Sequence, residues 1–450
     1  MKVRGLRSCF LALAMLSMVF VSACGSGAGN GSAGTNEGQN EKTGENYDKP
    51  TTLVFYSIAR DSEQSFNERM GDAIRKRFPN LTVKYVQRTT ANDLPAYISS
   101  GEKLDLVWGS LGSWPQVQDL GLAIDLTDLI KKHNIDLSTF EPSSIDAMKQ
   151  MGAGQILALP FENHTKVVYY NKDIFDKFGV EYPKDGMKWP EFHALAKKLN
   201  REDSGNFYTG YSPSVNSMFI QNELSLPFFQ QSGSTVRSTF NDPGWKTIIE
   251  NEFLAMARET GYHKVMDQYR NGGVPNLDTF TKNRALAMYP EGPLLPIVLP
   301  DDMAKLNWDI VAMPTLAEKP GVGYQAYPTY MSISTMSQEK DMAMQVIKFL
   351  TSKEFQTTLS KSGDMTILKD PEIQRVMGQD SKFKGKNYGA FFYNKFAPIA
   401  TKFPIESKVP GYTDVTNKLA QLAKGELDIN TALRQAEEAV NKKVDEQAAK

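Results

Sequence analysis

Residues 156–199 read ILALPFENHTKVVYYNKDIFDKFGVEYPKDGMKWPEFHALAKKL, and this stretch decides the fold. Its two short apolar runs, at residues 156–159 and 166–171, have the length and composition of buried strands. Trp189-Pro190 then begins a helical segment that reaches residue 199, with proline in the first turn, where its missing N–H is not needed. Short buried strands followed by a helix indicate an α/β protein.

The same alternation extends along the chain on both sides of this stretch. Apolar or alternating runs predict strands at residues 52–57, 81–86 and 104–108, with helices at 63–78 and 93–99 between them. Together these segments favour a mostly parallel sheet. Further helices are predicted by apolar periodicity, over residues 244–260, 262–270, 340–351, 352–360 and 430–444.

The N-terminus has the layout of a cleaved secretory signal peptide over residues 1–23. Basic residues precede an apolar run at 9–20, which is shorter than the roughly 20 residues that span a bilayer. The run ends in Val21-Ser22-Ala23-Cys24, which resembles the lipobox of bacterial lipoproteins, where the cysteine becomes the lipidated N-terminus. The alternative is a plain signal peptide with an incidental cysteine. The sequence therefore predicts export and a lipid anchor at Cys24.

Composition agrees with an exported, anchored protein. Residues 25–49 are rich in Gly, Ser and Asn without apolar periodicity, and we expect residues 24–49 to form a flexible tether, as in Gram-positive lipoproteins. The 450-residue chain has two cysteines, Cys9 in the signal and Cys24, so the mature chain can form no internal disulfide. A formal net charge of −1 gives no reason to expect nucleic acid as a partner.

The common catalytic and metal-binding sequence motifs are absent from the chain. The chain has no G-x-S-x-G, H-E-x-x-H or P-loop, and its four histidines lack the spacing of metal ligands. We therefore expect no metal, no cofactor and no enzyme activity. A glycosidase carboxylate pair is assembled from distant positions, so counting acids leaves that alternative open. The adjacent Tyr169 and Tyr170 point to opposite faces of a strand and are predicted to fill the core.

Several blocks in this order resemble the extracellular solute-binding proteins of ABC importers, in the group typified by maltose-binding protein. The stretch at residues 156–199 is the most diagnostic, because of its Tyr-Asn-Lys-Asp turn and its Trp-x-x-Phe helix start. The other blocks are DLVWGSLGSWPQVQDLGLAIDLTDLI at 105–130, FTKNRALAMYPEGP at 280–293, AMPT with GYQAYPTYMSIS within 312–334, VIKFLTSKEFQ at 346–356 and KGELDINTALRQAEEAVNKKV at 424–444.

The resemblance implies an α/β, two-lobed, type II periplasmic-binding-protein fold with a hinge between the lobes. Lobe one would hold residues 51–160 and 315–361, and lobe two residues 161–314 and 362–450. The implied role is a monomeric receptor at the extracytoplasmic face of the cell membrane. It would capture a carbohydrate, in particular a short oligosaccharide, and deliver it to the transmembrane subunits of an ABC permease. Another organic solute, such as a polyamine or a peptide, is the alternative ligand.

The first group of implied ligand contacts follows strand ends, where ligands bind in open α/β sheets. Trp108 could stack on a sugar ring or could instead fill the core, whereas Trp114 and Trp189 are assigned to packing. The candidates, after the first, third and crossover strands, are Ser57, Arg60, Trp108, Ser110, Glu162 and Asn163.

In lobe two, acids and aromatic rings are the implied contacts, because carboxylates bind hydroxyls and rings bind the C–H faces of sugars. Glu223 and Phe228 lie in a region where family members offer such groups, and Tyr412 lies near the C-terminal aromatic platform. Tyr327, which the stated bounds place in lobe one, follows the second crossover. Many sugar-binding relatives carry Gly-x-Trp where this chain has Glu291-Gly292-Pro293, so Glu291 is the candidate there and malto-oligosaccharide specificity is not expected.

Overall fold

The computed structural model describes residues 49–59, 61–90 and 93–449, which belong to a single unit of residues 47–450. The predicted signal peptide, Cys24, nearly all of the predicted tether and Arg60 lie outside the described residues. Among the described helices, none is both long enough and apolar enough to cross a membrane.

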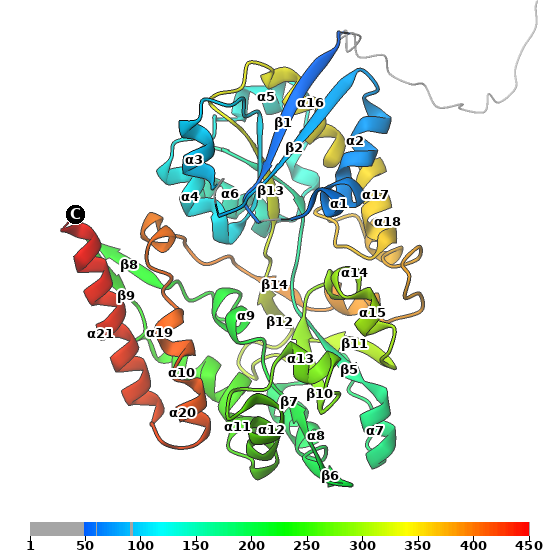
Figure 1. Cartoon of the computed structure of the whole chain (residues 1–450), viewed down its shortest axis with the longest axis vertical. Coiled ribbons are helices and arrows are strands. Elements are labelled where there is room, and N and C mark those ends of the chain that lie inside the picture. The colour runs from blue at the N-terminus through cyan, green and yellow to red at the C-terminus, as the bar shows by residue number, and fades with distance from the viewer. Residues whose placement is uncertain (1–48, 60, 91–92, 450) are drawn as a thin grey trace, which may run out of the picture. The chain divides into compact units, whose positions relative to one another are not determined.

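The first five-stranded sheet has the order β2-β1-β3-β13-β4, and Figure 1 labels β1, β2 and β13 of this sheet. β1 pairs in parallel with β2 and β3, whereas β13 is antiparallel to both β3 and β4. The first two predicted strands are confirmed, but the third begins two residues later than predicted, and the strand predicted at 156–159 lies at 159–162 instead. The strands are β1 (Thr51–Ser57), β2 (Leu81–Gln87), β3 (Leu106–Ser110), β4 (Leu159–Glu162) and β13 (Thr329–Ile333).

The second five-stranded sheet has the order β11-β5-β10-β7-β6. β5 is antiparallel to both of its neighbours, and only β10 and β7 pair in parallel. β6 and β7 form a hairpin through Ser204 and Gly205, whose φ values of 52° and 78° suit a tight hairpin turn. The prediction of a mostly parallel sheet is wrong here. The strands are β5 (Val167–Asn171), β6 (Arg201–Asp203), β7 (Asn206–Tyr211), β10 (Leu286–Glu291) and β11 (Trp308–Ala312).

Helices pack on the first sheet around a core that contains Phe55, Phe66 and Trp108. The helix predicted at 63–78 forms, but a π-turn at Asn67–Gly71 interrupts it. The helices near this sheet in the chain are α1 (Glu63–Phe66), α2 (Asp72–Arg77), α3 (Leu94–Ser99), α4 (Trp114–Asp119), α5 (Thr127–Lys132), α6 (Pro142–Met151), α16 (Lys340–Leu350) and α17 (Lys353–Ser362).

The second sheet separates two apolar clusters. Tyr169 and Tyr170 fall in different clusters, which confirms that neighbouring strand residues face opposite sides. The helices that follow its strands in the chain are α7 (Lys172–Phe178), α8 (Trp189–Lys197), α9 (Val215–Ile220), α10 (Pro243–Ile249), α11 (Ala255–Ala257), α12 (Thr260–Arg270), α13 (Leu277–Thr281), α14 (Leu295–Val298) and α15 (Pro300–Met303), with a π-turn at Glu250–Leu254.

The C-terminal part of the chain adds helices and two small ribbons. The final helix, α21, buries Leu433, Ala436, Val440 and Val444 on one face, as its periodicity predicts, and lies beside β8 and β9 (Figure 1). The remaining elements are β8 (Phe229–Ser232), β9 (Thr235–Ser238), β12 (Val322–Gln325), β14 (Lys395–Ala397), α18 (Pro371–Arg375), α19 (Thr413–Thr416), α20 (Leu419–Ala423) and α21 (Ile429–Ala448). The two sheets and their helices form the two lobes of an α/β protein.

Candidate functional site

Two cavities adjoin at the residues Ile220 and Tyr327, which line both of them. The first, called cavity one here, has a volume of about 660 Å³, and the second, cavity two, about 430 Å³. Both volumes fall within the range typical of small-molecule sites. The cavities together therefore form a candidate ligand groove.

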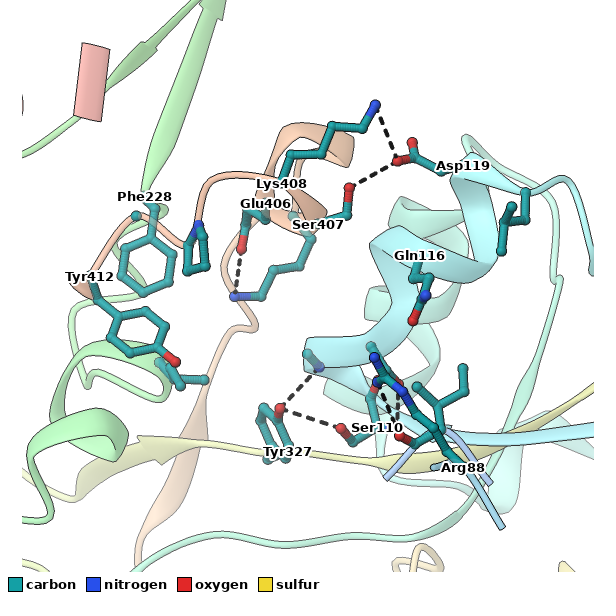
Figure 2. A pocket seen from close by; sticks show the side chains of 18 of the residues that line it. Arg88, Ser110, Gln116, Asp119, Phe228, Tyr327, Glu406, Ser407, Lys408 and Tyr412 are labelled. Carbon is teal, nitrogen blue, oxygen red and sulfur yellow. Dashed lines mark hydrogen bonds and ion pairs between the residues drawn. The ribbon is translucent and has the colours of Figure 1, made fainter. Parts of the chain in front are cut away.

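One wall of cavity one is built from elements of the first sheet. Ser110 ends β3, Gln116 and Asp119 lie on α4, and Arg88 directly follows β2 (Figure 2). The guanidinium of Arg88 donates to the carbonyl of Ile58 at 3.3 Å, which fixes this cation beside the cavity. Polar groups thus lie at the carboxyl ends of β2 and β3, the two strands that pair in parallel with β1 on either side, and this is the position where open α/β sheets bind ligands.

The opposite wall of cavity one is aromatic and basic. Phe228 stacks on Trp245, with ring centroids 5.7 Å apart and planes at 8°, and Tyr412 packs against Phe228 at 5.5 Å. Lys402 Nζ lies 5.1 Å from the centre of the Phe228 ring and 3.4 Å from Glu406 Oε2. Because Trp245 covers one side of Phe228, the half-buried Tyr412 is the ring more open to a ligand.

Tyr327 connects this wall to the first sheet. Its hydroxyl accepts a hydrogen bond from the Gly112 amide at 2.9 Å and lies 3.4 Å from Ser110 Oγ. A Cβ at position 112 would collide with that hydroxyl, so only glycine permits this approach. Burial raises the pKa of Tyr412, and Tyr327 adds to the rise, as expected of two phenols that share one cavity (Figure 2).

Cavity two is lined mainly by aliphatic side chains, with one ion pair. Lys166 pairs with Glu291, whose Oε1 also accepts a hydrogen bond from the Gly292 amide at 2.8 Å. Val298 is 67 % exposed at this cavity, which makes it one of the few large apolar side chains open to solvent. The aliphatic lining consists of Ile220, Leu277, Leu294, Leu295, Val298 and Leu299.

Glu162 lies beside the groove and does not line either cavity. Its side chain is fully buried and forms an ion pair with Arg69, which also contacts Asp61 at 3.4 Å. Burial raises the pKa of Glu162 to about 7, although Arg69 opposes the rise. Asn163, the next residue, is 1 % exposed, and its Oδ1 accepts from the His164 amide at 3.0 Å.

Three further candidates are packed into cores, and the structure does not bring them to the groove. Trp108 is 1 % exposed among the apolar residues of the first sheet, and Ser57 is fully buried, with its hydroxyl 3.1 Å from Asp61 Oδ2. Glu223 accepts from the Trp189 indole at 2.9 Å and from the Leu316 amide at 3.3 Å. Burial raises the pKa of Glu223 to about 8, so this acid belongs to the core of the second lobe.

Five of the predicted contacts do line the cavities, and several groove residues were missed. The five are Ser110, Phe228, Glu291, Tyr327 and Tyr412. Arg88 carried a usable signal, since it follows a predicted strand as Ser110 does. His164 lies in the crossover segment next to Asn163, and Lys402 offered no sequence signal. The missed residues include Arg88, Gln116, His164, Lys166, Lys402 and Glu406.

Comparison with known proteins decides the family. Residues 59–357, more than half of the chain, match the family described as bacterial extracellular solute-binding protein. The chain belongs to this family. The bacterial extracellular solute-binding proteins are receptors that act outside the cytoplasm, and the groove described above has the size for a bound solute.

Individual relatives in this family are distant. The arabinooligosaccharide-binding protein of Bacillus subtilis is 24% identical over 273 residues, which is 57% of each chain, so the match spans little more than half of that relative. An ABC substrate-binding protein from Listeria monocytogenes, solved in complex with cycloalternan, has a TM-score of 0.67 at 21% identity, covering 88% of this chain and 100% of that one.

A sugar transporter structure from Rhizobium etli, in an open conformation, has a TM-score of 0.66 at 19% identity, covering 86% and 98% of the two chains. At these identities the structures establish the fold. The predicted α/β, two-lobed binding-protein architecture is confirmed.

Proposed function

We propose that this solute-binding protein captures a carbohydrate, in particular a short oligosaccharide, and delivers it to an ABC permease without chemical change. The observation that carries the proposal is the pair of cavities joined at Tyr327. Aromatic rings and charged side chains that can form hydrogen bonds line cavity one. An elongated ligand of several rings would occupy both cavities.

The lining of cavity one suits sugars. The half-buried ring of Tyr412 offers a face for C–H groups, and such a contact is worth about 0.5–1.5 kcal/mol beyond area burial, by analogy with aromatic pairs. Arg88 and Gln116 can donate to hydroxyl oxygens, and Asp119 can accept from hydroxyl hydrogens. The ligands of two distant relatives, an arabinooligosaccharide and cycloalternan, support the same ligand class.

A thermal-shift screen of the protein tests the ligand class. The panel holds oligosaccharides of different linkage and length, with polyamines and short peptides as the competing solutes. A ligand present at 100 times its Kd should raise the free energy of unfolding by about 2.7 kcal/mol. Stabilisation by a polyamine or a peptide alone would overturn the proposal, and so would hydrolysis of a bound sugar, which would indicate a glycosidase.

We also propose that the receptor is a monomer anchored by lipid at Cys24 to the extracytoplasmic face of a Gram-positive membrane, and that residues 24–49 are its tether. The motif at Val21–Cys24 supports this, and it lies outside the described residues. The permease would then meet the folded body close to the membrane surface.

The lobe boundaries stay a proposal as well: residues 51–160 with 315–361, and residues 161–314 with 362–450. Every strand of the first sheet falls in the first set except the last two residues of β4, which supports the division. A hinge between lobes so divided predicts a smaller radius of gyration when ligand is bound. A ligand that leaves the X-ray scattering profile unchanged would contradict hinge closure.

A further inference from the structure

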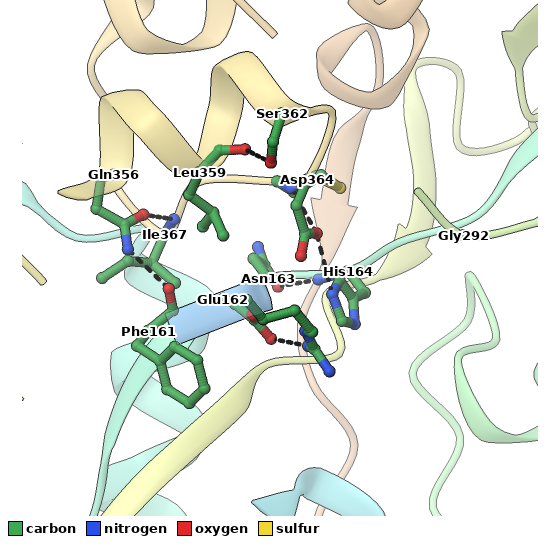
Figure 3. Close-up of polar contacts among 12 residues, drawn as sticks. Phe161, Glu162, Asn163, His164, Gly292, Gln356, Leu359, Ser362, Asp364 and Ile367 are labelled. Atoms are coloured by element: carbon green, nitrogen blue, oxygen red, sulfur yellow. Dashed lines mark hydrogen bonds and ion pairs between the residues drawn. The ribbon is translucent and has the colours of Figure 1, made fainter. Parts of the chain in front are cut away.

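Three potential metal ligands converge beside cavity two. Glu162, His164 and Asp364 each offer one ligand atom, and these atoms lie within 4.8 Å of one another. His164 Nε2 is 3.2 Å from Asp364 Oδ1, and the side chains come from the crossover after β4 and from the loop after α17 (Figure 3). The backbone holds these two segments together, because the Asn163 amide donates to the Met365 carbonyl at 3.2 Å.

Carboxyl groups outnumber guanidinium groups around this cluster. Arg69 is the cation that contacts it, and Arg69 is shared between Glu162 and Asp61. The carboxyl groups of Asp61 and Glu162 share this one guanidinium, and Asp364 adds a third carboxyl group beside His164. Buried charges of one sign are costly unless a counter-charge accompanies them.

Two atoms of the cluster have no hydrogen-bond partner. Glu162 Oε1 belongs to a fully buried side chain, and Arg69 binds only the other oxygen, Oε2. His164 Nε2 lies near Asp364 without the geometry of a hydrogen bond. An unpartnered carboxylate oxygen and an unpartnered imidazole nitrogen, both buried, are the donor atoms that a metal ion would take.

We propose that Glu162, His164 and Asp364 bind one divalent transition-metal ion of the Zn²⁺ or Mn²⁺ type. Two carboxylate oxygens and one imidazole nitrogen favour these ions over Ca²⁺ and Mg²⁺, which prefer oxygen ligands alone. Arg69, bound to Glu162 Oε2, would orient that carboxylate from outside the coordination shell.

The site lies next to cavity two, where a bound ion could contact a ligand. Three protein ligands leave a coordination position open. His164 also lines cavity two, so the open position can be reached by water or by a hydroxyl of a ligand in the groove. The carbonyl of His164 accepts from the Tyr327 amide at 2.7 Å, so an ion here would also brace the two segments that cross between the sheets. The proposal does not depend on the identity of the transported solute.

The full chain, purified without an affinity tag and stripped with EDTA, provides the test. Titration with ZnCl₂ in a calorimeter should give one saturable site per chain, together with a rise in melting temperature. Co²⁺ should show ligand-field absorption without a thiolate charge-transfer band, because neither Cys9 nor Cys24 takes part. A thiolate band, or no saturable binding of either ion, would overturn the proposal.

Variants locate the site. Asp364→Asn and the near-isosteric Glu162→Gln should each weaken Zn²⁺ binding at least tenfold, in line with the loss of a ligand. Asp341→Asn is the matched control, since Asp341 Oδ1 lies 3.1 Å from His133 Nε2 in a second histidine–aspartate pair, and this change should leave Zn²⁺ affinity unaltered. Unaltered affinity in both cluster variants, or an equal loss in the control, would contradict the assignment.

Discussion

The first sheet's core and the aromatic wall of cavity one each contain a ring that the sequence predicts as a sugar platform. Trp108, at 1 % exposure, packs against Phe66 and Phe161, with ring centroids 6.1 Å and 6.4 Å away. Tyr412 is half-buried and lines the cavity. The sequence predicts that the strand ends at Trp108, but β3 continues to Ser110, so Trp108 lies in the middle of the strand and its ring joins the core of the first sheet.

The largest expected effect comes from Trp108→Ala. Removing a fully packed indole should lower the free energy of unfolding by about 3–5 kcal/mol, whereas Trp108→Phe should cost less because a ring remains. Denaturant unfolding measures the loss. Ligand affinity, measured where the variant is still folded, should stay close to that of the parent protein. If the variant is stable but loses ligand affinity, Trp108 contacts the ligand and the core assignment is wrong.

Most of the fold could be predicted because its strands are short apolar runs that end at turns. Residues 52–57 and 81–86 form strands as expected. The strand predicted at 156–159 failed, because Ile156 and Leu157 precede the residues that pair with β13, and that partner lies far away in sequence. The direction of the strands was also not predicted. Whether two strands pair in parallel or antiparallel depends on the path of the chain between them, and β5 and β13 pair with strands that are distant in sequence.

The candidate site was less predictable, for a similar reason. Ser110 was found because it belongs to a block with a family resemblance, and Tyr412 because it lies near the position of the family's C-terminal aromatic platform. Lys402 reaches the groove through the fold of an irregular stretch that has no periodicity of its own. His164 and Asp364 lie 200 positions apart, so no local spacing could mark them as potential ligands of one ion.

Tyr412→Ala tests whether the aromatic ring that lines cavity one binds the ligand. If its ring stacks on a sugar, binding of a sugar found by the screen should weaken by about 1–3 kcal/mol, or roughly 5- to 150-fold. The loss in stability should be smaller than for Trp108→Ala, because Tyr412 is only half-buried. Calorimetric titration measures the affinity. Tyr393→Ala is the control, since Tyr393 is 55 % exposed and lines neither cavity.

Glu252 extends the comparison to buried acids, because it lacks the cation that accompanies Glu162. Burial raises its pKa well above the ordinary value, and Tyr324 donates to its Oε2. The folded protein therefore holds a proton that the unfolded chain releases above about pH 4.3, so stability should fall as pH rises, by at most about 1.4 kcal/mol per pH unit from this group.

Glu252→Gln should remove this contribution to the pH dependence. Denaturant unfolding measures the effect. Between pH 6 and pH 7, the free energy of unfolding should decrease less in the variant than in the parent protein. The two proteins should show the same pH dependence near pH 3, where both the folded and the unfolded carboxyl are protonated. Equal slopes in the two proteins would show that Glu252 ionises within the fold.

The smallest effect on the folded body is expected from Cys24→Ser. The change lies outside both regions compared above, so sugar affinity and melting temperature should not move. Growth with radiolabelled palmitate should give label in the parent protein and none in the variant, which should be released from the membrane. Label retained in the variant would exclude Cys24 as the lipidation site.

The exposure of Val298 at the rim of cavity two makes the protein convertible into an optical sensor. The chain contains only two cysteines, both at or before position 24, so replacing them with serine and introducing Val298→Cys gives a single thiol for a fluorescent dye. When the groove fills, the ligand replaces water around a dye at this rim. The change in the emission of the dye then reports binding of the solute.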